Sequence, residues 1–100
     1  MHGFRFEFRS TVPLAEAEQS LQLALYAVEG LFGQASVRLD AGYRVDQTRN
    51  AVVVDASTEV GVAVVRVYAG LLIREFGDEA FHVRRVETRA EPGKADGRAA

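Results

Sequence analysis

The chain has 100 residues, of which 48% are apolar and 26% charged, and its formal net charge is -2. This length and composition fit one globular domain with a small core and exclude the highly charged, disordered class of protein. The slight negative charge gives no general attraction to nucleic acid or anionic lipid, and the lack of cysteine excludes disulfides, thiol catalysis and cysteine-ligated zinc.

The first predicted strand covers residues 3–9, GFRFEFR, in which phenylalanines on one face alternate with charged residues on the other. This period of two is typical of a half-buried strand. Residues 11–33 then carry apolar side chains at helical spacing. Because Pro13 stands in the first turn and Gly33 just past the end, the pattern predicts a helix between them.

Residues 36–46, SVRLDAGYRVD, alternate again and predict one long strand, although Gly42 could instead mark a bulge or a turn. The residues expected to face inward are Val37, Leu39, Ala41, Tyr43 and Val45. Residues 47–50, QTRN, supply a turn, and residues 51–56, AVVVDA, predict a short interior strand. At least one of its three consecutive valines should therefore point to the sheet face opposite the helices.

Residues 58–77 are too long for a strand and predict a helix, despite their five valines. Thr58 is a candidate cap, and Gly77 a typical helix end. The last strand is predicted over residues 79–87, with an alternation that slips around Arg84 and Arg85, as at a bulge or a strand end. We expect a single domain over residues 1–88 and a disordered tail over residues 89–100, which carry no apolar pattern.

These elements form two β-α-β halves, and we expect an α+β domain of order β-α-β-β-α-β. Two right-handed crossovers in so small a domain interlock most simply as a four-stranded antiparallel sheet of order 4-1-3-2, with both helices on one face. This is the ferredoxin-like two-layer plan. Since that fold carries many unrelated functions, the function has to be argued from individual surfaces.

The helix predicted over residues 58–77 is apolar nearly all round, whereas a helix that covers a sheet needs only one apolar side. A second surface should therefore cover it. The residues predicted to form this contact surface are Val62, Ala63, Arg66, Gly70, Ile73 and Arg74, with Leu23 and Tyr26 of the first helix. Our leading hypothesis is a domain without enzymatic activity that acts through homo-oligomerisation, as a dimer or higher, or through binding another protein.

Two alternatives remain. Arg5, His82 and Arg84 are the best candidate cluster on the sheet face for a small-ligand or catalytic site. Nucleic-acid binding through the same arginine-bearing sheet is the third hypothesis. The sequence predicts no cofactor, since it has no Gly-x-Gly-x-x-Gly and no Walker loop. It also predicts no metal site, because its two histidines, His2 and His82, should lie about 15 Å apart on paired strands.

The sequence also predicts where the protein resides. The N-terminal MHGFRFEFRS interleaves charges with its apolar residues and lacks a signal-peptide core. The longest apolar stretch is interrupted by Arg66 and Arg74 and is a poor membrane span. Eleven of the twelve basic residues are arginine, a bias typical of GC-rich genomes. We therefore expect a cytoplasmic, bacterial protein; its ligand, partner and biological process do not follow from the sequence.

Overall fold

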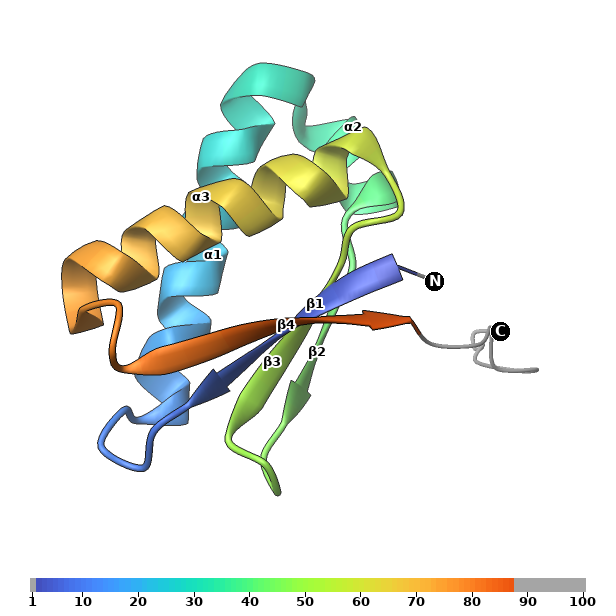
Figure 1. Ribbon diagram of the computed structural model, residues 1–100. Helices are drawn as coiled ribbons and strands as arrows, with labels where there is room; N and C mark the ends of the chain where they lie inside the picture. Colours follow the sequence, from blue (N-terminus) through green and yellow to red (C-terminus); the bar gives the residue numbers. More distant parts are fainter. Residues whose placement is uncertain (1, 88–100) are drawn as a thin grey trace.

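A computed structural model describes residues 2–87 of the chain (Figure 1). The elements in chain order are β1 His2–Phe8, α1 Leu14–Phe32, α2 Gln34–Asp40, β2 Tyr43–Asp46, β3 Ala51–Asp55, α3 Glu59–Phe76 and β4 Phe81–Glu87. The predicted tail over residues 89–100 lies outside the described residues, as does the end of the predicted domain at residue 88.

The four strands form one antiparallel sheet in the order β2-β3-β1-β4, which is the predicted order 4-1-3-2 read from the other edge. Helices α1 and α3 cross one another on one side of this sheet, as Figure 1 shows. The fold is therefore α+β, with a sheet layer and a helix layer. Within the described residues, no helix combines the length and the apolar character needed to cross a membrane.

The predicted long strand over residues 36–46 is wrong in its first half, which forms α2, a third helix where two were predicted. Gly33, at φ 90, ends α1, and the chain resumes a helix at once. Val37 and Ala41, four residues apart, face the core, whereas Leu39 is 84% exposed instead of inward. The inward positions of Val37 and Ala41 fit a helix as well as a strand, because residues four apart lie on the same side of either element.

Strand β4 pairs with β1 without interruption from His2 opposite Glu87 to Phe8 opposite Phe81, so the bulge suggested around Arg84 and Arg85 is absent from the described strand. The irregular sequence pattern has another cause. Arg85 lies opposite Phe4 on the helix side of the sheet, and its guanidinium carbon is 5.6 Å from the centre of the Phe4 ring. The aromatic ring thus gives this charged side chain a favourable place on the helix side of the sheet.

The core lies between the helix layer and the central strands. The predicted inward phenylalanines Phe6 and Phe8 are buried there, and the Phe6 ring packs 4.8 Å from the ring of Tyr68 on α3. Val52 and Val54 of β3 point to the same side and are also fully buried. Each buried aromatic contributes about 2 to 3 kcal/mol through the apolar area that it removes from water.

The helix predicted over residues 58–77 is confirmed as α3. The hydroxyl of Thr58 accepts a hydrogen bond from the Gly61 amide at 2.9 Å and donates one to the Asp40 carbonyl, which ties the start of α3 to the end of α2. Gly77 follows the last turn at φ 89. Packing against the sheet and α1 outweighs the weak helix propensity of the valines, which costs only tenths of a kcal/mol each.

Candidate functional site

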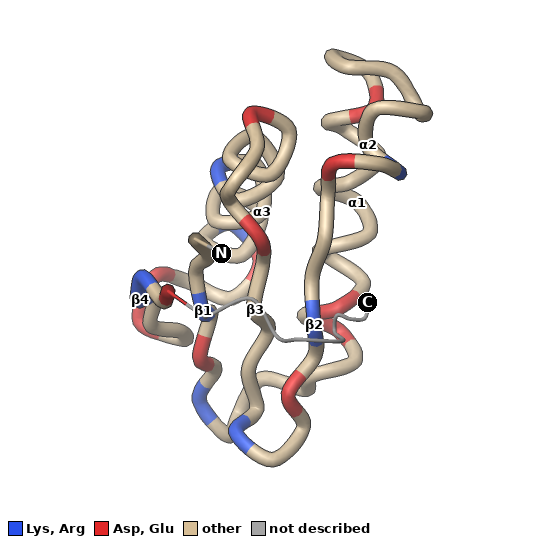
Figure 2. Tube along the Cα trace, turned by 90° about the vertical axis from the view of Figure 1, so that its right-hand side faces the viewer, with Lys and Arg blue, Asp and Glu red and all other residues tan. Residues whose placement is uncertain are grey.

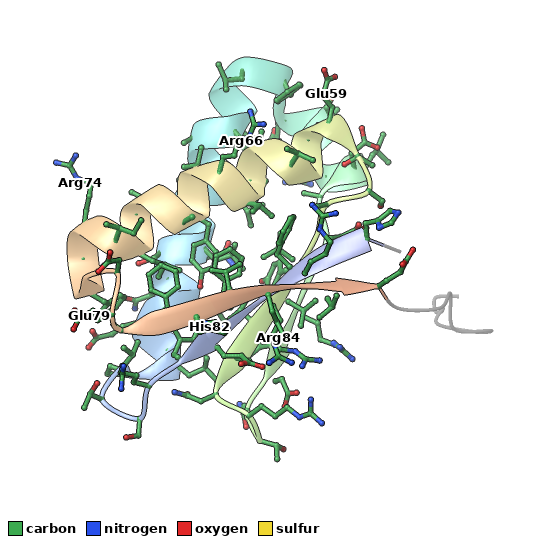
Figure 3. The ribbon with its side chains drawn as sticks, in the orientation of Figure 1. Glu59, Arg66, Arg74, Glu79, His82 and Arg84 are labelled. Carbon is green, nitrogen blue, oxygen red and sulfur yellow. The ribbon has the colours of Figure 1, made fainter. Side chains whose placement is uncertain are left out.

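The outer side of α3 is the first candidate surface. Figure 3 shows Glu59, Arg66 and Arg74 on the side of this helix that is turned away from the sheet. Glu59 stands in the first turn and Arg74 in the last, where each charge interacts favourably with the helix dipole. Between them lie Ala63 and Gly70, and no atom lies within 4 Å of a Cβ built on Gly70. Small side chains therefore lie on both sides of Arg66, which stands midway along this face.

Most of the residues predicted for this contact surface are accessible. Ile73 is 49% exposed, and on the neighbouring α1 Leu23 is 57% and Tyr26 73% exposed. Arg66, Gly70 and Arg74 are exposed, whereas Val62 and Ala63 are half-buried. Because α1 and α3 pack against one another, both contribute to a single outer side of the helix layer (Figure 1).

Within residues 2–87, four large apolar residues outside the predicted contact surface are also exposed, and two of them, Tyr43 at 41% and Val83 at 37%, only moderately. Leu31 is 75% and Leu39 84% exposed, and they flank the junction between α1 and α2 at Gly33. The prediction of a strand over residues 36–46 placed Leu39 inward and concealed this feature. A helical reading of the same residues would have placed it outside.

The second candidate surface is the sheet face opposite the helices, where basic and acidic residues are interleaved along the strands (Figure 2). Arg5 of β1 and Arg84 of β4 lie directly opposite each other in the register, which brings two members of the predicted cluster together. One carboxylate serves both: Glu7 Oε2 lies 3.6 Å from Arg5 Nη1 and 3.9 Å from Arg84 Nε. Like charges opposite one another are unfavourable, and Glu7 offsets this only in part.

Val53 lies in the same row, opposite Arg5 on one side and Arg44 on the other. It is the valine expected on the face away from the helices, yet only 3% of it is exposed. The Arg5 side chain is 18% exposed, and its Nε has no hydrogen-bond partner among the described residues. A row of guanidinium groups beside a buried apolar residue can bind an anion.

The two histidines are held apart. His2 lies opposite Glu87, with Nδ1 3.6 Å from Oε2, whereas His82 lies opposite Glu7, five residues along the paired strands. His82 therefore joins Arg5 and Arg84 on the sheet face as predicted, but in the neighbouring row. Among residues 2–87, no three histidine, aspartate or glutamate side chains lie close enough to hold a metal ion.

Two hollows lie beside the helices. One, of about 420 Å³, lies between α1, α2 and β2, where Gln22 Nε2 donates to the Tyr43 hydroxyl at 3.0 Å. The other, of about 460 Å³, lies between α3 and the paired strands β1 and β4 and includes Arg66 and Arg85 in its lining. Neither was foreseen, because each is formed by segments far apart in the chain.

Tyr68 is the one described residue whose pKa is clearly shifted. Burial raises its pKa, and the negative charge of Glu18 raises it further. Its hydroxyl donates to the Ala17 carbonyl of α1 at 2.8 Å. The phenol is enclosed between α1, α3 and the sheet, so it has a structural role and cannot reach a substrate.

Comparison of the chain with models of protein families, with curated proteins and with solved structures finds no significant match.

Proposed function

We propose that this protein has no enzymatic activity and acts by associating with copies of itself through the outer side of its helix layer. The observation that carries the proposal is the exposure of Ile73 on α3 and of Leu23 and Tyr26 on α1, the helix that packs against it. Scattered apolar side chains are common on protein surfaces, but here three of them stand on two helices that pack against one another, one of which also carries exposed small residues. We further propose a ferredoxin-like domain, with α2 as an additional helix, in the cytoplasm.

The charges of α3 suit a pairing of identical copies. Glu59, Ala63, Arg66, Gly70 and Arg74 fall within a stripe of roughly 80° at 3.6 residues per turn, with Arg66 midway along its length. A two-fold axis between residues 66 and 67 would place two antiparallel copies of α3 so that Glu59 lies level with Arg74 of the partner subunit. The same axis places Ala63 level with Gly70 of the partner subunit, where small side chains let the two helices approach closely.

This register is tested by exchanging its charges. Arg74→Glu should weaken self-association roughly tenfold, because at both ends of the symmetric contact the new carboxylate would lie level with that of Glu59 of the partner subunit. The double variant Glu59→Arg with Arg74→Glu should restore most of the lost affinity. It also places both charges unfavourably on the helix dipole, so the subunit should lose stability while association recovers.

The measurement is the dissociation constant from sedimentation equilibrium, with circular dichroism to confirm folding. Leu39→Asp is the matched control, since this exposed apolar residue lies on α2, outside the proposed contact. Equal affinity in wild type and Arg74→Glu would refute the register. An affinity that is lost in Arg74→Glu and not recovered in the double variant would also refute it.

A second candidate function is anion binding on the sheet face. It rests on Arg5 and Arg84, which lie opposite one another with a single carboxylate between them. Titration with inorganic phosphate, followed by the amide resonances of β1 and β4, tests it. Saturable shifts that disappear in Arg84→Gln would support this site, and their absence in the wild type would eliminate it. Binding of nucleic acid to the same face would require a salt-dependent retardation of oligonucleotides.

A further inference from the structure

The hollow between α3 and the paired strands β1 and β4 has the size of a small-molecule site. Its volume of about 460 Å³ lies within the range of 300 to 1,000 Å³ that ligand pockets in proteins commonly have. Its walls come from three parts of the chain: the start of β1, the segment from Ala56 into α3, and the second half of β4.

The charged groups of this lining are all basic. Arg66 projects from α3 and Arg85 from β4, and His2 stands at the start of β1. No carboxylate belongs to the lining, and among residues 2–87 neither arginine has an acidic group within ion-pair distance. His2 Nδ1 lies 3.6 Å from Glu87 Oε2, and both of those side chains are largely exposed. Arg66 stands at the outer rim of the hollow, on the side of α3 turned from the sheet, and Arg85 on the strand below it (Figure 3). Two arginines in one lining without a carboxylate favour an anionic ligand.

The remaining lining is apolar. Phe4 of β1 and Val62 and Val65 of α3 provide most of it, together with Ala56. Arg85 is held over the ring of Phe4, so its charge is positioned on the helix side of the sheet, at the edge of this apolar wall. His2 and Glu87 form the next row on this side of the sheet. The ring of Phe4 is one partner of the Arg85 charge, and a ligand would give it a second.

We propose that this hollow binds a small organic anion with a compact apolar body, of the class of aromatic carboxylates. The carboxylate is bound by Arg66 and Arg85, and the ring packs on Val62, Val65 and the edge of Phe4. A bidentate contact from a guanidinium supplies the charged hydrogen bonds, and the apolar wall excludes water from one side of the ring.

This inference goes beyond the proposed self-association and does not depend on it. Val62 and Arg66 nevertheless belong to both surfaces, so the two proposals have to be tested apart. Ile73→Asp serves this purpose, because Ile73 belongs to the proposed subunit contact but not to the lining of the hollow. Binding should be at least as tight in this variant as in the wild type.

The experiment is a titration with benzoate, followed by the amide resonances of the folded protein. Saturable shifts are expected around Phe4, Val62 and Val65, in the wild type and in Ile73→Asp. Arg66→Gln and Arg85→Gln should each raise the dissociation constant at least tenfold, the effect of losing one charged hydrogen bond. Arg38→Gln is the control, since Arg38 is an exposed arginine of α2 outside both the hollow and the proposed subunit contact, and it should leave binding unchanged.

Two further probes separate the contributions. Inorganic phosphate carries charge without an apolar body, and benzyl alcohol carries the ring without charge; each should bind at least tenfold more weakly than benzoate. Phosphate that binds as tightly as benzoate would overturn the proposal in favour of simple anion binding. The absence of saturable shifts with benzoate in both proteins would also overturn it, whatever the oligomeric state.

Discussion

Substitution of two glycines on α3 tests the packing of the helix on which both proposals depend. A Cβ added at Gly61 would lie 2.2 Å from the Asp55 carbonyl oxygen, well under the 3.0 Å below which such contacts are essentially never found. The obstructing atoms belong to the backbone of β3 and the following residue, so no side chain can rotate away. Gly61→Ala therefore requires α3 to move away from the strand.

The cost of this movement can be estimated. Overpacking of a core costs about 1 to 3 kcal/mol, and contact with backbone places Gly61→Ala at the upper end. Replacing a helical glycine with alanine returns up to about 1 kcal/mol. The free energy of unfolding should therefore fall by about 2 kcal/mol, equivalent to a decrease of roughly 8 to 16 °C in Tm for a domain of this size.

Gly70→Ala is the matched control, because a Cβ there meets no atom within 4 Å. It should raise the free energy of unfolding by up to about 1 kcal/mol. Urea denaturation, carried out at low protein concentration so that association does not contribute, measures both variants. A Gly61→Ala protein as stable as the wild type would refute the close approach of α3 to β3.

The remaining predictions concern Tyr68 and Asn50. Tyr68→Phe should lower the free energy of unfolding by about 1 kcal/mol at neutral pH, because it removes the hydrogen bond to the Ala17 carbonyl. Burial raises the Tyr68 pKa above its ordinary value of about 10, so the native state keeps a proton that the unfolded state loses. The wild type should therefore lose stability as pH rises above about 10, and its free energy of unfolding should approach that of Tyr68→Phe. A difference between the two proteins that grew with pH would contradict the burial of this phenol. Asn50, at φ 51, shares its side-chain amide donor among the carbonyl oxygens of Phe8, Arg9 and Val12. Asn50→Asp replaces that donor with an acceptor and should lower the free energy of unfolding, measured by urea denaturation, by about 1 to 3 kcal/mol. Asn50→Gly keeps the backbone conformation and should lower it less. Equal stability of Asn50→Asp and wild type would show that the amide contributes nothing.

The elements that the sequence predicted correctly have patterns that only one structure satisfies. Nineteen or twenty residues between Thr58 and Gly77 exceed any strand, and strict alternation in residues 3–9 excludes a helix. The order of the sheet followed from two interlocked crossovers. The strand predicted where the chain forms α2, Gln34–Asp40, was wrong because so short a segment fits the period of a strand and that of a helix. Only the tertiary contact of Val37 with the core decides between the two.

Some of the candidate surfaces could likewise be predicted from the sequence, and others could not. The outer side of α3 follows from helical periodicity, so its residues could be named from the sequence. Arg5 and Arg84 could be brought together once the strand order was inferred, because β1 and β4 are neighbours in that order. The hollow beside α3 was missed, since Phe4, Val62 and Arg85 meet only through the exact register of β1 with β4 and the position of α3 above them. The close approach at Gly61 likewise depends on tertiary geometry alone.

The proposed self-association is tested most directly by light scattering across a dilution series of the wild type and of Ile73→Asp. The wild type should have a mass at high micromolar concentration that is a multiple of the 10.9 kDa of one chain, and it should dissociate on dilution. Ile73→Asp should weaken association at least about a hundredfold, since each subunit would bury an unpaired carboxylate in place of an apolar side chain. A wild type that stays at the mass of one chain at high micromolar concentration would contradict the proposal, as would an Ile73→Asp variant that associates like the wild type.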